Sequence, residues 1–175
     1  MWAPKFFHNL AGVDQDAAEL AADVGVRTSS APTYFPSYQG YIDGGVISNN
    51  PSMAAIAQAL DPRNAEPGHR PTLDRITLLS IGTLTTKRYN DKDTVDRGKL
   101  GWIGDLVQIL LGGTSGVPAF QADHVLFPRY RRIDVLVDRD TDLDDASDEN
   151  LRFIESQVGL VDFPGAQAFL QQHWF

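Results

Sequence analysis

The sequence contains no cysteine, so disulfide bonds, thiol catalysis and cysteine-ligated zinc sites are excluded. It also has no run near the ~20 apolar residues that a transmembrane helix needs, which argues against stable membrane insertion. Its fifteen Lys and Arg residues form no long block, and the net charge is −8. This balance predicts no nucleic-acid partner and disfavours docking on anionic membranes. No signal-peptide pattern opens the chain, which slightly favours a cytoplasmic location.

Alternating helix and strand patterns predict an α/β fold built as layers. With 175 residues, 42% of them hydrophobic, the chain can form one core without a second domain. Strands are expected at 41–43, 76–81 and 131–137, and helices at 14–24, 51–60, 102–111, 117–127, 146–158 and 165–173. The expected helix caps are Asp14, Asn50 (with Pro51 as the first helical residue) and Asp145. The terminal Trp174-Phe175 is expected to pack back onto the domain.

The stretch 27–51 carries the clearest chemical signal. Its short apolar segment Tyr41-Ile42 ends in Asp43, and Gly44 and Gly45 follow. A carboxylate at a strand end, with glycines that let another group approach the backbone, is suited to a reactive position. Asp-Gly is also a common turn pair, so a plain turn at Asp43 is the alternative interpretation.

Three segments of this stretch together resemble the C-terminal half of the patatin-like acyl hydrolases: Ser30–Pro36, Tyr41–Gly45 and Asn49–Pro51. Weaker similarities lie at Pro4–Asn9, Leu79–Thr83, Tyr130–Ile133 and Leu143–Ala146. The resemblance implies that Asp43 is the base of a Ser–Asp catalytic dyad, supported by the motif residues Gly44, Gly45, Asn49, Asn50 and Pro51. It also implies a layered sandwich of a central mixed sheet between helices, a lipid or other acyl ester substrate, and no cofactor or metal.

The nucleophile part of that family pattern is missing. Neither a Gly-x-Ser-x-Gly elbow nor a glycine-rich oxyanion loop occurs before Asp43. Residues 1–175 are therefore predicted to form the C-terminal portion of a single patatin-like catalytic domain, with an incomplete sandwich. On this hypothesis the chain supplies the aspartate, but not the serine, of a lipid acyl ester hydrolase. The alternative is an inactive fragment or degenerate relative that acts as a non-enzymatic interaction module and self-associates through exposed core surface.

Other candidate sites rest on weaker patterns. Ser115 lies in Gly113-Thr-Ser-Gly-Val117, which lacks the last glycine of an elbow and follows a helix, so a helix cap is its expected role. Ser29 and Ser30 are expected to cap a turn or a helix start. The acidic stretch 138–149 has oxygen ligands at several EF-hand positions, but Leu143 replaces the glycine of the sharp turn. A polar loop is expected at 84–99, and residues 102–111 predict a core helix or, alternatively, a lipid-facing element.

Overall fold

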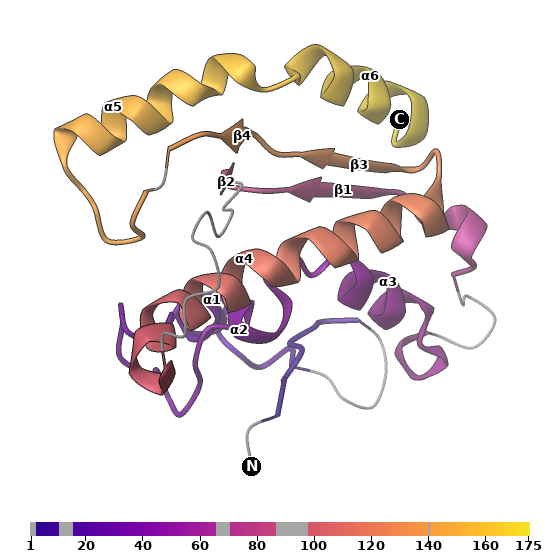
Figure 1. Cartoon of the computed structure of the whole chain (residues 1–175). Helices are drawn as coiled ribbons and strands as arrows, with labels where there is room; N and C mark the ends of the chain where they lie inside the picture. Colours follow the sequence, from indigo (N-terminus) through magenta and orange to yellow (C-terminus); the bar gives the residue numbers. More distant parts are fainter. Residues whose placement is uncertain (1–2, 11–15, 66–70, 87–97, 140) are drawn as a thin grey trace.

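The computed structural model describes residues 3–10, 16–65, 71–86, 98–139 and 141–175, which form a mixed α/β structure (Figure 1). The predicted α/β class is thereby confirmed. The α-helices of this part of the chain are α1 (Ala21–Thr28), α2 (Gly45–Ser48), α3 (Ser52–Leu60), α4 (Gly98–Leu126), α5 (Asp148–Gln157) and α6 (Phe163–His173). The 3-10 helices are η1 (Pro62–Asn64), η2 (Leu73–Arg75) and η3 (Val158–Leu160). The strands are β1 (Leu78–Ile81), β2 (Thr85–Thr86), β3 (Tyr130–Ile133) and β4 (Leu136–Val137).

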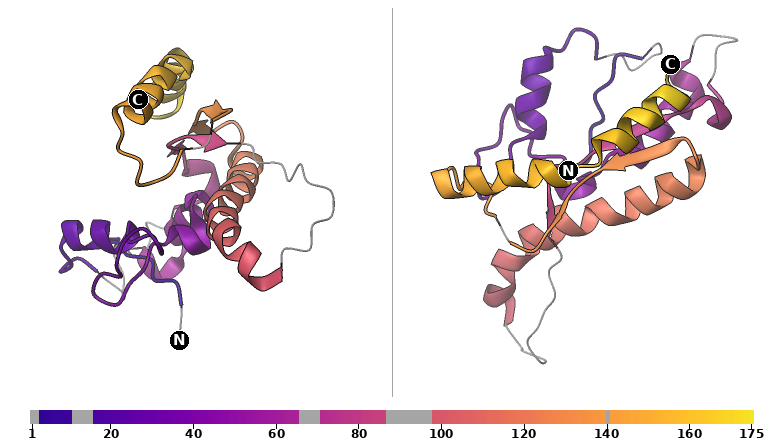
Figure 2. Two further views of the ribbon diagram at one scale, coloured as in Figure 1. Left: turned by 60° about the vertical axis from the view of Figure 1, so that its left-hand side comes forward. Right: turned by 90° about the horizontal axis from the view of Figure 1, so that it is seen from above.

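The strands pair as two short parallel sheets, β1 with β3 and β2 with β4. Parallel neighbours need a long crossover connection, and α4 supplies it between β1 and β3. In Figure 1, α5 and α6 lie along one side of the strands and α4 along the other, and Figure 2 shows the same order of layers. The predicted strand 131–137 is divided at Asp134 and Val135, where pairing passes from one sheet to the other.

Helix α4 is one continuous element of 29 residues. The predicted interruption at 112–116 is therefore wrong, although this stretch contains three glycines and Pro118 follows it within the helix. Helix propensity is a weak preference that tertiary contacts override. Here Thr114 donates its hydroxyl proton to the carbonyl of Leu110 one turn earlier, at 2.7 Å, and the same turn contacts α2.

The buried core lies where α3 meets the second half of α4. Ile56, Ala122 and Leu126 are at most 3% exposed, and the partly buried residues packed against them are Met53, Leu60, Ile76, Leu78 and Tyr130. The predicted strand 76–81 begins at Leu78, and its last residue, Ile81, is exposed rather than buried. The core is small for the length of the chain, because much apolar surface stays outside it.

Part of that apolar surface lies along one side of α4. Seven of its described large hydrophobic side chains are exposed: Trp102, Leu106, Ile109, Leu110, Val117, Phe120 and Val125. The predicted core role of 102–111 is thus wrong for the side chains that the structure describes. At the C-terminus, Trp174 and Phe175 are also exposed instead of packing back. None of the described helices combines the length and hydropathy needed to span a membrane.

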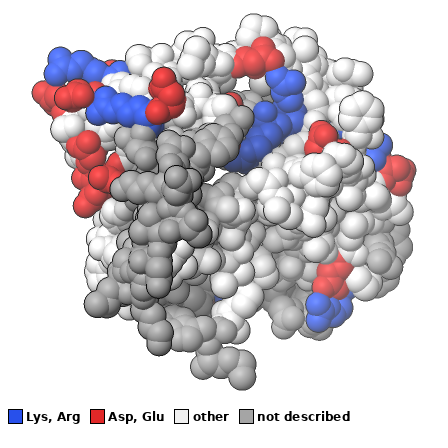
Figure 3. All heavy atoms as spheres, in the orientation of Figure 1, with Lys and Arg blue, Asp and Glu red and all other residues white. Residues whose placement is uncertain are grey.

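One cluster of charged side chains lies at the start of α5. Figure 3 shows acidic and basic side chains clustered together over the start of α5, while much of the same face has no charged side chain in view. Arg139 pairs there with Glu149 (3.2 Å), and Arg152 lies 3.9 Å from Asp148. These pairs are exposed, so each contributes little to stability. Within the acidic stretch 138–149, Asp140 lies outside the described residues, and the described His, Asp and Glu side chains form no cluster of three able to hold a metal.

Helix α1 begins later than predicted and ends at Thr28 rather than Val24. The predicted cap, Asp14, lies outside the described residues. Ser29 and Ser30 donate their hydroxyl protons to the carbonyls of Gly25 (2.8 Å) and Val26 (2.7 Å). The predicted cap of a turn or a helix start is therefore wrong, because both hydroxyls bond to the last turn of α1, whose two carbonyls also accept the Ser29 N–H.

The C-terminal helices begin at side-chain caps. Helix α5 begins at Asp148, and its cap is Ser147 instead of the predicted Asp145. The Asp145 carboxylate accepts the N–H of Ser147 at 3.0 Å, in the turn that precedes the helix. Helix α6 begins at Phe163, because the Asp162 carboxylate accepts the N–H of Gly165 at 2.9 Å. Of the predicted loop 84–99, Thr85–Thr86 form β2, Gly98 and Lys99 begin α4, and 87–97 lie outside the described residues.

The Asp162 cap makes the α6 start sensitive to acid. The N–H of Gly165 and, less strongly, the guanidinium of Arg131 hold the pKa of Asp162 below its ordinary value of 3.8. A carboxyl whose pKa is lowered by folding stabilises the fold above its unfolded pKa, and this contribution is lost as the pH falls through the folded pKa. We expect Asp162→Ala to lower the urea midpoint at pH 7, and to lower it less at an acid pH at which the Asp162 carboxylate becomes protonated. Asp162→Asn keeps an acceptor for Gly165, so its loss at pH 7 is expected to be smaller. Equal losses at both pH values would contradict the assignment, and far-UV circular dichroism provides the measurement.

Candidate functional site

Asp43 lies two residues before α2, which begins at Gly45. Its N–H donates to the Ser30 carbonyl at 2.9 Å, and its Oδ1 accepts the N–H of Gly45 at 2.6 Å. Among the described residues, no hydrogen bond or ion pair involves Oδ2, and the side chain is half-buried. One carboxylate oxygen is therefore held in place while the other is left available to an incoming proton donor.

The predicted strand 41–43 is wrong. Tyr41 forms only an isolated antiparallel bridge with Tyr38. Gln39 and Gly40 between them have positive φ values of 51° and 83°, the signature of a type I′ turn. The alternative prediction, a turn at the Asp-Gly pair, describes Asp43 better. Its carboxylate accepts the N–H of Gly45 two residues later, as in an Asx turn.

A buried arginine fixes the loop that precedes Asp43. Arg27 is 8% exposed, and its guanidinium carbon lies 5.1 Å from the ring centre of Phe7 and 5.0 Å from that of Tyr41. Its Nη1 pairs with Glu19 (2.9 Å), and its Nε donates to the Gln39 side chain at 2.9 Å. The sequence analysis missed this residue, because a lone arginine gives no sign of the aromatic rings that will enclose it.

Gly44 and Gly45 differ in their surroundings. Gly44 is exposed, and a Cβ added there would lie 3.4 Å from the Thr28 hydroxyl oxygen, an ordinary contact. Gly45 is buried against α4, and its carbonyl oxygen lies 3.2 Å from the hydroxyl oxygen of Thr114. The glycine that allows a close backbone approach is therefore Gly45, and the element it approaches is α4. The contact lies in the stretch of α4 where an interruption was predicted.

Asn49 and Asn50 attach the motif to that turn of α4. Asn49 donates its N–H to the Thr114 hydroxyl and its side-chain amide to the Ser115 hydroxyl, both at 3.2 Å. The Asn50 side chain, 1% exposed, donates to the Ser115 carbonyl at 3.1 Å and accepts the N–H of Ser52, also at 3.1 Å. Helix α3 begins at Ser52, so Pro51 precedes the helix rather than starting it.

Ser115 is therefore a contact residue of α4, which binds the side chains of Asn49 and Asn50. It lies inside α4, so the predicted role as the cap of a second helix is wrong, and it has no strand-to-helix turn of the kind a nucleophile elbow requires. Ser29 and Ser30 are likewise engaged with the end of α1.

A hydrogen-bonded chain joins this region to the strands. Ser52 donates to the Ser80 hydroxyl in β1 (3.2 Å), and Arg132 of β3 donates to the same oxygen (2.7 Å). The Arg132 Nη2 also pairs with Asp134 at 2.6 Å. The segments around Asn50, Ser80 and Arg132 each resemble the patatin-like family on their own. In the structure they are joined by hydrogen bonds. The weak similarity at Leu143–Ala146 lies elsewhere, before α5.

Gly82 provides the space that this ion pair occupies. A Cβ at this position would lie 2.4 Å from the Asp134 carboxyl carbon and 2.6 Å from Arg132 Nη2. We expect Gly82→Ala to destabilise the fold by about 1–3 kcal/mol, as overpacking does, because the pair and its bond to Ser80 must move. Gly25→Ala is the matched control: it is within α1 with no atom near the added Cβ, and is expected to stabilise by about 0.5–1 kcal/mol. Urea unfolding measures both, and similar effects at the two glycines would contradict the steric argument.

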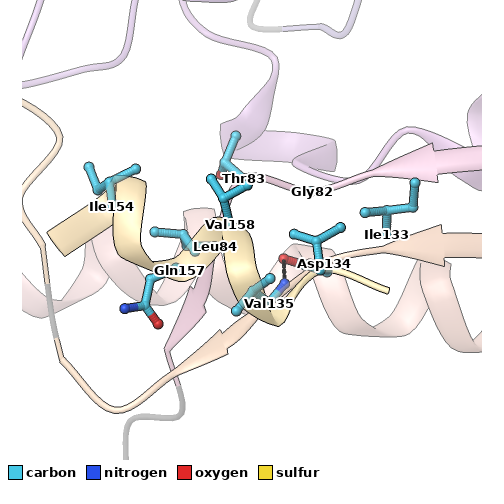
Figure 4. A pocket seen from close by; sticks show the side chains of 10 residues that line it. Gly82, Thr83, Leu84, Ile133, Asp134, Val135, Ile154, Gln157 and Val158 are labelled. Carbon is cyan, nitrogen blue, oxygen red and sulfur yellow. Dashed lines mark hydrogen bonds between the residues drawn. The ribbon is translucent and has the colours of Figure 1, made fainter. Parts of the chain in front are cut away.

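Two cavities lie beside Gly82. One, of about 120 Å³, is mainly polar and includes Asn49, Ser115, Arg132 and Asp134 in its walls. The other, of about 110 Å³, is mainly apolar and lies beneath α5 and η3 (Figure 4). The chemistry available in this region is therefore that of an aspartate with one available oxygen, amide and hydroxyl donors, and neighbouring apolar space.

Comparison with known proteins finds relatives that match only part of this chain. The chain is 43% identical over 82 residues to CotR of Bacillus subtilis, a sporulation hydrolase by name, covering 47% of this chain and 23% of that protein. It is 32% identical over 114 residues to patatin-like protein 1 of Arabidopsis thaliana, covering 53% of this chain and 28% of the relative. It is 28% identical over 167 residues to patatin-like protein 2 of Oryza sativa subsp. japonica, covering 75% of this chain and 41% of the relative.

The chain thus spans about a quarter of the length of the first of these relatives. No family model and no solved structure matches it. Over part of its length, the chain is a distant homologue of the patatin-like proteins and of the CotR hydrolase.

Proposed function

We propose that this chain supplies the general-base aspartate, Asp43, of a serine acyl hydrolase that acts on lipid esters. The observation that carries the proposal is the state of this carboxylate. One oxygen is fixed by the Gly45 N–H, and the other has no partner among the described residues, on a half-buried side chain. Partial homology to patatin-like proteins supports acyl ester chemistry.

In this mechanism Asp43 acts without a histidine. Its Oδ2 takes the proton from a serine hydroxyl as the serine oxygen attacks the acyl carbonyl, and the proton then passes to the leaving alcohol. Asp43 next takes a proton from water as the water oxygen attacks the acyl-serine ester, and it returns that proton to the serine oxygen as the acid is released. The Gly45 N–H holds the carboxylate in one orientation through both halves of the reaction.

The serine is proposed to come from outside these 175 residues, which would form the C-terminal portion of a layered patatin-like catalytic domain. The sequence has no Gly-x-Ser-x-Gly motif, and Ser115 is in the middle of a helix. Two-stranded sheets are smaller than the four to six strands usual in stable sheets. Additional strands from the same domain would complete the sheet beside β1 and β3.

Labelling with a fluorophosphonate, read by intact mass and peptide mapping, tests the proposal. We expect no label on the 175-residue chain alone, and one label on an elbow serine in protein expressed from the complete reading frame. Asp43→Ala should abolish that label. A label on Ser115, removed by Ser115→Ala, would instead place the nucleophile inside this chain and overturn the assignment.

The exposed apolar side of α4 favours a second candidate, a non-enzymatic interaction module. Trp102, Ile109 and Phe120 are each more than a third exposed along one helix, which is costly for an isolated domain. In this case the chain self-associates through α4. Concentration-dependent mass in light scattering, together with no fluorophosphonate label in either form of the protein, would favour the module over the hydrolase.

A further inference from the structure

Helix α4 has an apolar stripe on the side that faces away from α2. Its residues follow one another at intervals of three or four positions, the spacing that keeps side chains on one face of a helix: Trp102, Leu106, Ile109, Gly113, Val117, Phe120 and His124. None of these seven is an Asp, Glu, Lys or Arg. Ser115, which binds Asn50, and the buried Ala122 lie on the opposite side, because an α-helix has 3.6 residues per turn.

The described part of the chain leaves the large side chains of the stripe uncovered. Phe120 is 63% exposed and Val117 is 61% exposed, near the middle and the end of the stripe. In the left view of Figure 2, α1, α2 and α3 lie on one side of α4, and no described helix or strand lies on the opposite side. A helix with apolar residues on opposite sides is typical of one that is enclosed between two layers. The stripe therefore has the composition of a contact surface.

Three glycines lie in the middle of α4, and nothing in the described chain uses their small size. A Cβ added at Gly112, Gly113 or Gly116 would have no atom within 4 Å. Glycine inside a helix is destabilising relative to alanine, and it is useful where another backbone approaches closely. Gly113 is the central residue of the stripe, so the place for such an approach is the stripe itself.

The stripe has the same spacing in both directions from Gly113. Large side chains lie four, seven and eleven residues away on each side: Ile109 and Val117, Leu106 and Phe120, and Trp102 and His124. A second α4 that runs in the opposite direction, with the two Gly113 residues facing each other, therefore brings large side chains to the same level along the whole contact. A surface that is complementary to itself is what a two-fold dimer requires.

The size and charge of the surface fit a weak dimer. The exposed parts of the large stripe residues and of the neighbouring Leu110 amount to roughly 600 Å² on each copy, or about 1,200 Å² per pair, the lower limit for specific stable interfaces. The net charge of −8 on each copy opposes association. The dissociation constant is therefore expected in the micromolar range, and added salt should lower it by screening the repulsion.

We propose that α4 binds a second copy of this chain, with the two α4 helices antiparallel and crossing at Gly113. Leu106 of one copy then lies at the level of Phe120 of the second copy. The pairing leaves Asp43 accessible, because α2, which follows Asp43, contacts the opposite side of α4. This gives a partner and a geometry to the self-association considered above, and it depends neither on hydrolysis by Asp43 nor on its absence.

The central glycine provides a test with effects of opposite sign. We expect Gly113→Ala to raise the dimer dissociation constant at least tenfold in sedimentation velocity, because two added methyl groups collide at the crossing. The same change should raise the urea midpoint of the dilute, monomeric chain, because alanine favours a helix. Gly112→Ala is the matched control on the same helix, turned by about 100° from the stripe. It should raise the urea midpoint equally and change the dissociation constant less than twofold. Equal effects of the two variants on the dissociation constant would overturn the proposed crossing.

Single cysteines report the direction of the second helix, because the chain has none of its own. A mixture of Leu106→Cys and Phe120→Cys chains should form a disulfide-linked dimer under mild oxidation, at least tenfold faster than either variant alone. Two cysteines must bring their Cα atoms within about 7 Å to be linked, so the reaction selects residues that face each other. Faster linking of each variant to itself would indicate a parallel pair and would contradict the antiparallel arrangement.

Other occupants of the stripe give different results. A chain that stays monomeric at every concentration and salt level, or that binds phosphatidylcholine vesicles through α4 without pairing, would overturn the proposal. So would a dimer of the 175-residue chain that is absent from protein expressed from the complete reading frame, because other parts of the domain would then cover the stripe. Fluorophosphonate labelling is read separately. Pairing without any label would remove only the proposed hydrolase function, and a label without pairing would remove only this inference.

Discussion

Alanine at position 43 is expected to lower ester hydrolysis about 10²- to 10⁴-fold, the usual contribution of a general base. The loss should fall on kcat with little change in KM, because Asp43 accepts a proton in the transition state rather than holding the bound ester. Hydrolysis of a chromogenic short-chain ester by protein from the complete reading frame measures both constants. The expectation follows from the available Oδ2 atom of Asp43 beside the oxygen that Gly45 holds.

Two further variants separate chemistry from structure. Asp43→Asn keeps an oxygen for the Gly45 N–H but cannot accept the proton, so it should fold like the parent and lose as much activity as alanine. Asp61→Ala is the control carboxylate, because Asp61 also bonds the amide two residues on, that of Arg63 at 2.9 Å. Activity within threefold of the parent in Asp43→Asn would show that the carboxylate serves only the turn.

Leu126→Ala is expected to destabilise the protein by about 2–5 kcal/mol. The side chain is fully buried between α3 and α4, against Ile56 and Ala122, and its removal leaves a cavity that the helices cannot close. This loss is a large share of the 5–15 kcal/mol that a typical domain has in total. Urea unfolding followed by circular dichroism gives the free energy.

Leu106→Ala is the matched change on the same helix. Its side chain is 47% exposed, so we expect a change within about 0.5 kcal/mol. A loss at Leu106 comparable to that at Leu126 would show that the outer side of α4 is covered in solution, which would support self-association through that surface.

Local signals predicted the elements whose ends are set locally. Helix α3 ends at Leu60 before Asp61-Pro62 as expected, and β1 ends before Gly82. The interruption of α4 was predicted wrongly because glycine disfavours a helix locally, whereas the contacts of Asn49 with Thr114 and Ser115 form only in the folded chain. For the same reason, the sequence could identify Asp43 but not Arg27, since the Arg27 contacts with Phe7 and Tyr41 depend on the folded chain.

The connected network was also beyond local reasoning. The segments around Asn50, Ser80 and Arg132 lie far apart in the sequence, and each alone is a weak pattern. Their hydrogen bonds exist only because α3, β1 and β3 meet at one place. Resemblance to a family suggested that these segments belong together, but only the fold shows how they touch.

The parallel pairing of β1 with β3 has a consequence for the order of folding. The two strands lie on opposite sides of α4 in the sequence, so none of their hydrogen bonds can form before the long intervening chain has closed. Helices form within about a microsecond, whereas non-local strand pairing is slow. Helix α4 should therefore form first and return Tyr130 to the side of Leu78. Strand substitutions would then accelerate unfolding more than they slow folding.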